Sequence, residues 1–322
     1  MRFINVTFES SALVVMAGAH VTITGSTFSQ SAESSGISLY GHGGGTSIQL
    51  GNSSISGGMQ GIAMQSRAVL EAQQVTISGA AGLRDRAVEP SYSSAAELAT
   101  RSSENNQDLE CCEFMYGIRV EDAIGNVTGC SITDCARGGV VFLGLDATGV
   151  VNDCTFLRNK IGVLAAEEAS VNLRGCHTVE SGHGAVVRSS ACLDCAECSS
   201  EKDSVGLHCS GGSSLTALKL SVMEARVSGC VIESEAMASF TDCSVAGSGA
   251  KGIVAMQRAQ LSLQGCSVSQ AKSTCVEVSG SATGKLAGCA LVNSRQGVSS
   301  TGHGTELHAH RLCFNNMQLS AA

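Results

Sequence analysis

The sequence predicts an all-β solenoid in which short parallel strands stack in successive coils. The main observation is a repeat whose steps are 22 or 23 residues long. A glycine opens most copies, and Cys275 takes its place once: Gly117, Gly139, Gly162, Gly184, Gly206, Gly229, Gly252 and Gly297. A fixed period of this length is typical of a solenoid, because each unit is stable only when stacked on its neighbours. The composition agrees, since 38 glycines, one proline and no tryptophan suit narrow coils better than an aromatic core.

Each copy of the repeat reads as three short strands. The first begins at the opening glycine, as in residues 252–255. In the second, Leu261 and Leu263 alternate with Gln260 and Ser262, which is the two-residue period of a strand. The third is a brief pair of residues after a cysteine. Because no helical segment separates these strands, we predict a parallel β-helix whose coils are spaced about 4.8 Å apart.

The same pattern extends over the N-terminal part of the chain, where Gly36, Gly61 and Gly82 open further coils. We therefore predict a single β-helix domain over residues 1–322, with about thirteen coils of roughly 22–25 residues. The period breaks once, and we assign residues 84–115, which contain the only proline, to a loop insertion. Since the first eight residues already alternate like a strand, we expect the chain to start inside a coil, with its caps missing.

Half of the 16 cysteines fall at one phase of the repeat, directly after a predicted sharp bend. They are Cys130, Cys154, Cys176, Cys198, Cys243, Cys266, Cys289 and Cys313. We expect them to point inward and to stack as a cysteine ladder. Leu220 takes this place in one coil, and a leucine can replace a small apolar filler but not a metal ligand or half a disulfide. This pattern favours reduced thiols and an intracellular location.

Three segments carry a resemblance to a known family: the Gly-Ile-x-Val of residues 117–120, the Ala-x-Leu-x-Leu of residues 259–263 and the Gly-Cys-x-Ile of residues 129–132. Together they resemble the right-handed parallel β-helix repeat of the pectin-lyase-like superfamily. They are most similar to its non-enzymatic carbohydrate-binding and sugar-hydrolase-type repeats, as in the F-box β-helix adaptors. The resemblance implies the fold, which hosts lyases, hydrolases, adhesins and adaptors, and does not select one of these functions.

The sequence argues against several classes of function. A net charge of −8 disfavours nucleic-acid binding, and no apolar run is long enough to span a membrane. Gly-His-Gly, a signature of the polygalacturonase-like hydrolases, occurs around His42, His183 and His303. Those enzymes also need Asn-Thr-Asp, Asp-Asp and Arg-Ile-Lys segments, which are missing here. We interpret the three histidines as turn residues and predict no catalytic residue.

Two clusters could suggest metal binding. An acidic edge is expected where the turns after the first strands stack, at Glu121, Asp122, Asp146, Glu167 and Glu168. We interpret it as a solvated turn, because calcium requires six or more oxygens at close range. Cys192, Cys195 and Cys198 resemble half a zinc site, but the repeat places Cys195 and Cys198 inward and Cys192 outward. We predict no metal and no cofactor.

The outward place on the first strand gives the strongest indication of function. It is apolar in most coils, and we call this set the stripe: Val141, Leu164, Val186, His208, Val231 and Val254. Outward places on the second strand are polar, so the stripe is expected to be covered or to bind a partner. We predict a non-catalytic binding or scaffold module that contacts a protein, a second copy of itself or a glycan. The alternative is a secreted polysaccharide lyase or glycoside hydrolase.

Overall fold

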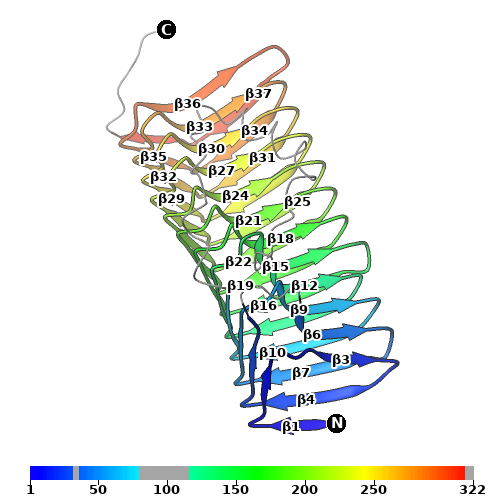
Figure 1. Cartoon of the computed structure of the whole chain (residues 1–322). Coiled ribbons are helices and arrows are strands. Elements are labelled where there is room, and N and C mark those ends of the chain that lie inside the picture. Colours follow the sequence, from blue (N-terminus) through cyan, green and yellow to red (C-terminus); the bar gives the residue numbers. More distant parts are fainter. Residues whose placement is uncertain (32–35, 80–115, 316–322) are drawn as a thin grey trace.

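The structure, a computed structural model, describes residues 1–31, 36–79 and 116–315 (Figure 1). These residues form a rod of stacked coils with three parallel sheets along its length. Sheets A and B each have 13 strands and sheet C has 12, and every strand pairs with the equivalent strand of the adjacent coils. The predicted parallel β-helix is confirmed. The predicted insertion at residues 84–115 lies outside the described residues.

Sheet A contains the second strands of the repeat: β1 (Arg2–Ile4), β4 (His20–Thr24), β7 (Ser47–Gly51), β10 (Val69–Gln73), β13 (Ile124–Thr128), β16 (Thr148–Asn152), β19 (Ser170–Arg174), β22 (Cys192–Ala196), β25 (Ser214–Leu218), β28 (Met237–Thr241), β31 (Gln260–Gln264), β34 (Thr283–Ala287) and β37 (Glu306–His310). Sheet B contains the short third strands: β2 (Thr7–Glu9), β5 (Thr27–Ser29), β8 (Ser54–Ser56), β11 (Thr76–Ser78), β14 (Ser131–Thr133), β17 (Thr155–Leu157), β20 (His177–Val179), β23 (Ser199–Glu201), β26 (Ser221–Met223), β29 (Ser244–Ala246), β32 (Ser267–Ser269), β35 (Ala290–Val292) and β38 (Cys313–Asn315). Sheet C contains the strands that follow the opening glycines: β3 (Leu13–Met16), β6 (Ile37–His42), β9 (Gln60–Gln65), β12 (Tyr116–Glu121), β15 (Gly138–Leu143), β18 (Ile161–Ala166), β21 (His183–Val187), β24 (Val205–Cys209), β27 (Ser228–Ile232), β30 (Lys251–Ala255), β33 (Thr274–Ser279) and β36 (Gln296–Thr301).

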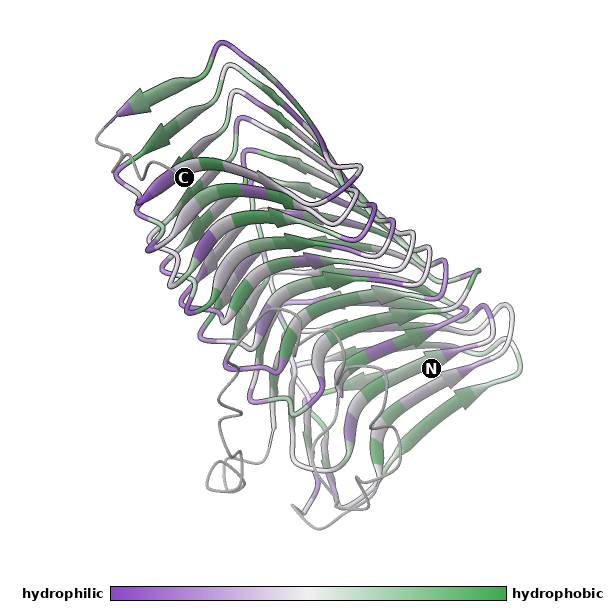
Figure 2. Cartoon of the chain, turned by 90° about the horizontal axis from the view of Figure 1, so that it is seen from above, coloured by the Kyte–Doolittle hydropathy of each residue, from purple (hydrophilic) through white to green (hydrophobic). Residues whose placement is uncertain are grey.

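The core fills the inside of the rod, and hydrophobic and hydrophilic segments alternate along the coils (Figure 2). Phe142 shows how the coils share this space, because its side chain is fully buried against two glycines of sheet A. A Cβ built on Gly149 would lie 2.1 Å from the Phe142 ring, and one on Gly125 would lie 3.0 Å from it. The equivalent residue one coil further on is Val171, so these glycines leave room for the aromatic ring.

The corner between sheets A and B explains the cysteine repeat. Ser26 occupies this place in an early coil, and its hydroxyl accepts a hydrogen bond from the Val6 N–H, 3.2 Å away. In a later coil the Cys154 sulfur accepts the Cys130 N–H at 3.4 Å. The small polarisable group therefore fills space and also satisfies a buried amide of the preceding coil. Cys313, in contrast, is exposed, so its predicted inward orientation is wrong. The strand register pairs it with Ala290, one residue after the ladder place of Cys289, and Leu312 takes that place and packs against the core.

A second polar corner lies between sheets B and C. The side-chain oxygen Oδ1 of Asn159 accepts a hydrogen bond from the backbone N–H of Cys135 at 2.9 Å. In the following coils, the Ser181 hydroxyl accepts from the backbone N–H of Asn159 at 3.2 Å, and the Asp203 carboxylate accepts from that of Ser181 at 2.6 Å. Asp203 is fully buried and also receives the hydroxyl hydrogens of Thr178 and Ser200, both at 2.6 Å. Burial nevertheless raises the pKa of Asp203, although these three donors oppose the shift.

The Asp203→Asn variant is expected to be more stable than the wild type at neutral pH. A carboxyl whose pKa is raised by folding stabilises the fold below its unfolded pKa, and this contribution is lost as the pH rises through the folded value. Asparagine cannot ionise, and Asn159 already occupies the equivalent place in another coil. Urea unfolding from pH 3 to pH 8 should show the advantage of the variant growing with pH. A constant difference between the two proteins would contradict this assignment.

Within residues 1–31, 36–79 and 116–315 there is no helix with the length and hydropathy needed to cross a membrane.

Candidate functional site on the outer face of sheet C

The strand register places the stripe in one column along the rod. Val141 pairs with Leu164, Leu164 pairs with Val186, and the column continues through the rest of the stripe. Arg119 precedes Val141 in this column, and Glu277 follows Val254. Between Arg119 and Glu277, the column therefore consists of apolar side chains interrupted by His208.

The stripe is nevertheless not exposed, which corrects one part of the sequence-based prediction. Val141 and Val254 have no exposed surface, and Val231, the most exposed apolar member, retains 9%. The strands are bent near the opening glycine, so that a Cβ on Gly138 would lie 2.5 Å from a methyl group of Val141. Tyr116, Leu143 and Ile161 also pack against the stripe. It therefore forms an apolar floor, bordered by side chains that remain partly exposed.

His208 interrupts the floor and forms a hydrogen bond with a buried carboxyl group. Its Nε2 lies 2.9 Å from Glu233 Oε1, and Glu233 is only 4% exposed. In the next two coils Lys251 Nζ donates to Glu277 Oε1 at 2.7 Å. Equivalent places in other coils hold uncharged residues, such as Val186 for His208. Stacking of the coils therefore does not require these charges, and buried charges are costly unless they are paired.

His183 completes the cluster, and here the sequence interpretation is wrong. It is the first residue of β21, not a turn residue, and its ring stacks on His208 with centroids 5.6 Å apart. Burial, followed by the charges of His208 and Lys160, lowers the pKa of His183 to about 3, so its ring is neutral at pH 7. His42 also belongs to a strand, at the end of β6, whereas His303 lies in a turn as predicted.

A second polar group borders the N-terminal end of the floor. The Tyr40 hydroxyl donates to Gln65 Oε1 at 2.7 Å, and the Gln65 amide donates to Glu121 Oε2 at 2.7 Å. Glu121 is also paired with Arg119 at 2.8 Å, and the Arg119 guanidinium lies 5.9 Å from the centre of the Tyr116 ring. Both ends of the floor thus present hydrogen-bonding groups held in place by neighbours on other coils.

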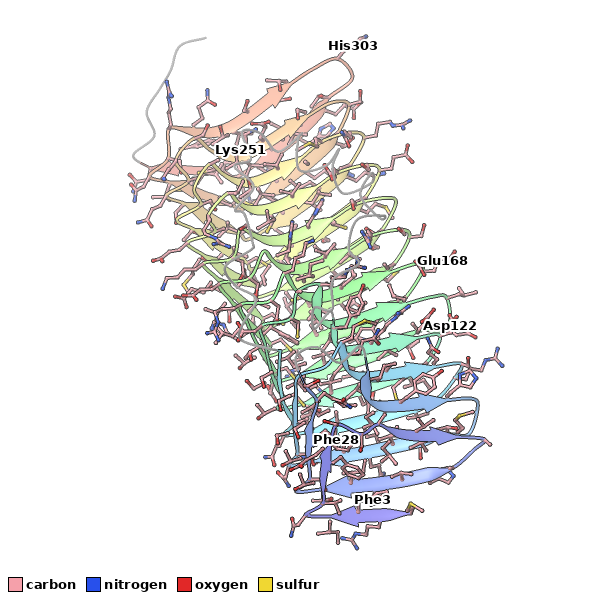
Figure 3. All side chains as sticks on the ribbon, in the orientation of Figure 1. Phe3, Phe28, Asp122, Glu168, Lys251 and His303 are labelled. Carbon is pink, nitrogen blue, oxygen red and sulfur yellow. The ribbon has the colours of Figure 1, made fainter. Side chains whose placement is uncertain are left out.

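The five residues of the predicted acidic edge do not all lie in turns. Glu121 ends strand β12, whereas Asp122 and Glu168 lie in turns along one edge of the rod (Figure 3). Asp146 is paired with Arg67 at 3.2 Å, which brings together residues on either side of the predicted insertion. Glu167 has a positive φ of 58°, the left-handed geometry of a tight turn. These are the properties of a solvated edge.

The three cysteines that resemble half a zinc site do not converge. Cys192 is exposed on the outside of sheet A, and Cys195 and Cys198 are buried inside the rod. In the part of the chain that the structure describes, no group of three or more His, Cys, Asp or Glu residues could hold a metal ion. On the outer face of sheet C, the His208–Glu233 pair and the neutral ring of His183 are groups that could accept or donate a proton.

Comparison with known proteins places the fold. The periplasmic alginate epimerase AlgG is similar over 94% of this chain and 78% of its own, with 10% identity and a TM-score of 0.54. The surface protein and adhesin PfbA of Streptococcus pneumoniae matches over 98% and 91% of the two chains, with 8% identity and a TM-score of 0.35. At these identities the likeness concerns the fold alone. No curated protein shows significant sequence similarity to the chain.

The family assignment comes from the sequence itself. The family described as "Right handed beta helix region" matches residues 11–160, 96–223 and 161–314, which together cover most of the chain. This agrees with the three continuous parallel sheets of the structure. The chain therefore belongs to the right-handed β-helix family.

Proposed function

We propose that the chain is a non-catalytic binding module that holds an extended glycan against the outer face of sheet C. The observation that supports this most strongly is the partly buried cluster of His183, His208 and Glu233, in which Glu233 is 4% exposed. Ionisable groups that the fold does not need, held in one place by burial and by each other, are typical of a binding or catalytic site.

The surroundings of the cluster suit a sugar chain. Sugars present both hydroxyl groups and apolar C–H faces, so they require hydrogen-bonding side chains beside an apolar surface. Tyr116, Leu143 and Ile161, which pack against the stripe and remain partly exposed, supply apolar surface, and polar groups around Arg119 and His208 lie at separate points along the same column. The floor follows the rod axis, which favours a linear ligand. Alginate, on which AlgG acts according to its name, is one such polymer.

The proposal is tested by binding measurements with alginate and with dextran, a neutral glucan. We expect the wild type to bind at least one of them in calorimetry and the Glu233→Gln variant to bind it about tenfold more weakly, since a hydrogen bond to a charged group contributes about 1.5–3 kcal/mol. Asp194→Asn is the matched control, because this carboxyl is exposed on sheet A and the substitution makes the same charge change. Thermal unfolding of each variant verifies the fold.

Three outcomes would contradict the proposal. Absence of binding to both polymers would favour a protein partner or self-association through this face. Equal losses in Glu233→Gln and Asp194→Asn would place the ligand elsewhere. Release of shortened or chemically altered glycan would favour the alternative, an enzyme acting on polysaccharide, in which the His208–Glu233 pair would transfer a proton.

A further inference from the structure

A row of cations follows the edge where sheet B leads into sheet C. Each cation lies one or two residues before a strand of sheet C, from β15 to β36. The row consists of Arg137, Lys160, Arg226, Lys272 and Arg295. Arg137 is partly exposed and the other four are exposed. The first and last members are seven coils apart, which corresponds to about 34 Å along the rod.

The row, like the scattered residues Arg2, Arg188, Lys285 and Arg311, lacks the ion pairs that the other described cations form, and it alone gathers such cations along one edge. Eight other Lys and Arg residues form ion pairs with carboxylates: Arg67, Arg119, Arg158, Arg174, Lys202, Lys219, Lys251 and Arg258. Among the described residues, no carboxylate lies within ion-pair distance of any member of the row. In a chain with a net charge of −8, five unpaired cations along one edge form a distinct electrostatic feature.

The nearby acids do not neutralise the row. Asp134 is paired with Arg158 at 2.9 Å, and Glu180 and Glu224 raise the pKa of Lys202 together with Glu201, which has the largest effect. Each of these acids lies at the end of a sheet B strand or just beyond it, before the cation row. Asp203 lies one place before the row within the repeat and is fully buried, and the charge of Arg226 opposes the burial that raises the pKa of this carboxyl.

We propose that this row binds the acidic groups of a linear glycan that carries a carboxylate or sulfate on its sugar units. The inference rests on the proposed glycan binding and adds the charge class of the ligand. Arg137 and Lys160 lie in consecutive coils, as do Lys272 and Arg295, so cations recur at the axial spacing of about 4.8 Å. The row lies at the start of the strands that carry His208 and the partly exposed side chains beside the stripe, so one glycan chain can contact both sets of groups.

The test uses Lys160→Glu combined with Lys272→Glu, because neither side chain makes a hydrogen bond within the described residues. Arg226 is left unchanged, since it donates to the Ser181 carbonyl and the Ser204 hydroxyl. The matched control is Arg188→Glu combined with Lys285→Glu, which makes the same charge change at two exposed cations that lie away from this edge and form no ion pair within the described residues. Alginate, heparin and dextran serve as probes, so that carboxylated, sulfated and neutral chains are compared.

We expect the wild type to bind alginate or heparin with an affinity that falls as ionic strength rises, and to bind dextran much more weakly. The Lys160/Lys272 variant should lose about tenfold or more in affinity for the anionic chain, and the control variant less than about threefold. Equal losses in both variants, or equal binding of dextran and the anionic chains, would overturn this inference while leaving glycan binding intact. Absence of binding to every probe would overturn both proposals.

Discussion

Gly184→Val will destabilise the rod by more than about 4 kcal/mol, a loss at the upper end of single-substitution effects. A Cβ at this position would lie 2.5 Å from the carbonyl oxygen of Gly206 in the next coil and 2.9 Å from the Asp203 carboxylate. Neither group can retreat, because the first belongs to a paired strand and the second is held by three hydrogen bonds. Chemical unfolding followed by circular dichroism measures the loss.

Gly44→Ala is the control for this experiment. No heavy atom lies within 4 Å of a Cβ built at Gly44, so the variant should keep the stability of the wild type within about 0.5 kcal/mol. One coil accommodates Cys275 in the place of the opening glycine, which shows that a small unbranched side chain can fit where the next coil allows it. If Gly184→Val unfolded at the same denaturant concentration as Gly44→Ala, close coil stacking would not be the reason for the glycine repeat.

Phe142→Ala is expected to cost about 3–5 kcal/mol, the usual range for removing a buried aromatic side chain. The ring is fully buried, and the two glycines beside it, Gly125 and Gly149, cannot fill the space that it leaves. Unfolding by urea measures the effect, and the slope of the transition shows whether the rod still unfolds as one unit.

A second substitution makes this prediction specific. Gly149→Val alone should also destabilise the rod, because its side chain would overlap the Phe142 ring. Combined with Phe142→Ala, the valine occupies the vacated space, as Val171 does one coil further on. The double variant should therefore be more stable than the sum of the two single losses predicts, by about 1–3 kcal/mol. Additive losses would show that the ring and the glycine do not share this space.

The fold could be predicted from the sequence because the coil repeats its requirements. A glycine opens the sheet C strand where the next coil comes closest, as at Gly162, whose Cβ would lie 2.5 Å from the Gly184 oxygen. Alternation along residues 259–263 matches the inward and outward sides of β31. The opening glycine and the alternation each reflect contacts between one coil and an equivalent neighbouring coil. Such features recur with the period of the repeat, so the repeat is sufficient to predict them.

The site was harder to predict because it depends on differences between coils. The strand register aligns the stripe in one column, but its burial also involves packing by Tyr116, Leu143 and Ile161, which an alternating pattern does not reveal. His183 shares its Gly-His-Gly context with His303, yet it begins a strand whereas His303 lies in a turn, so this motif does not distinguish the two structures. The pairing of His208 with Glu233 joins residues 25 positions apart, and neither residue alone suggests the other.

At the corner of sheets A and B, several side chains accept a hydrogen bond from a backbone amide of the preceding coil. The hydroxyl of Ser53 accepts from the backbone N–H of Ser26, the hydroxyl of Ser26 from that of Val6, and the sulfur of Cys130 from that of Val75. In these places, each coil depends on the following coil to satisfy one of its amides. These side-chain hydrogen bonds therefore give the rod a direction, from its N-terminal to its C-terminal coils. A ribosome adding residues at the C-terminal end always leaves the newest coil with an unmet donor until the next turn is made. Because an unpaired buried N–H is costly, the most recently synthesised coil of a nascent rod is the least stable one. It reaches its full stability when the next coil has formed.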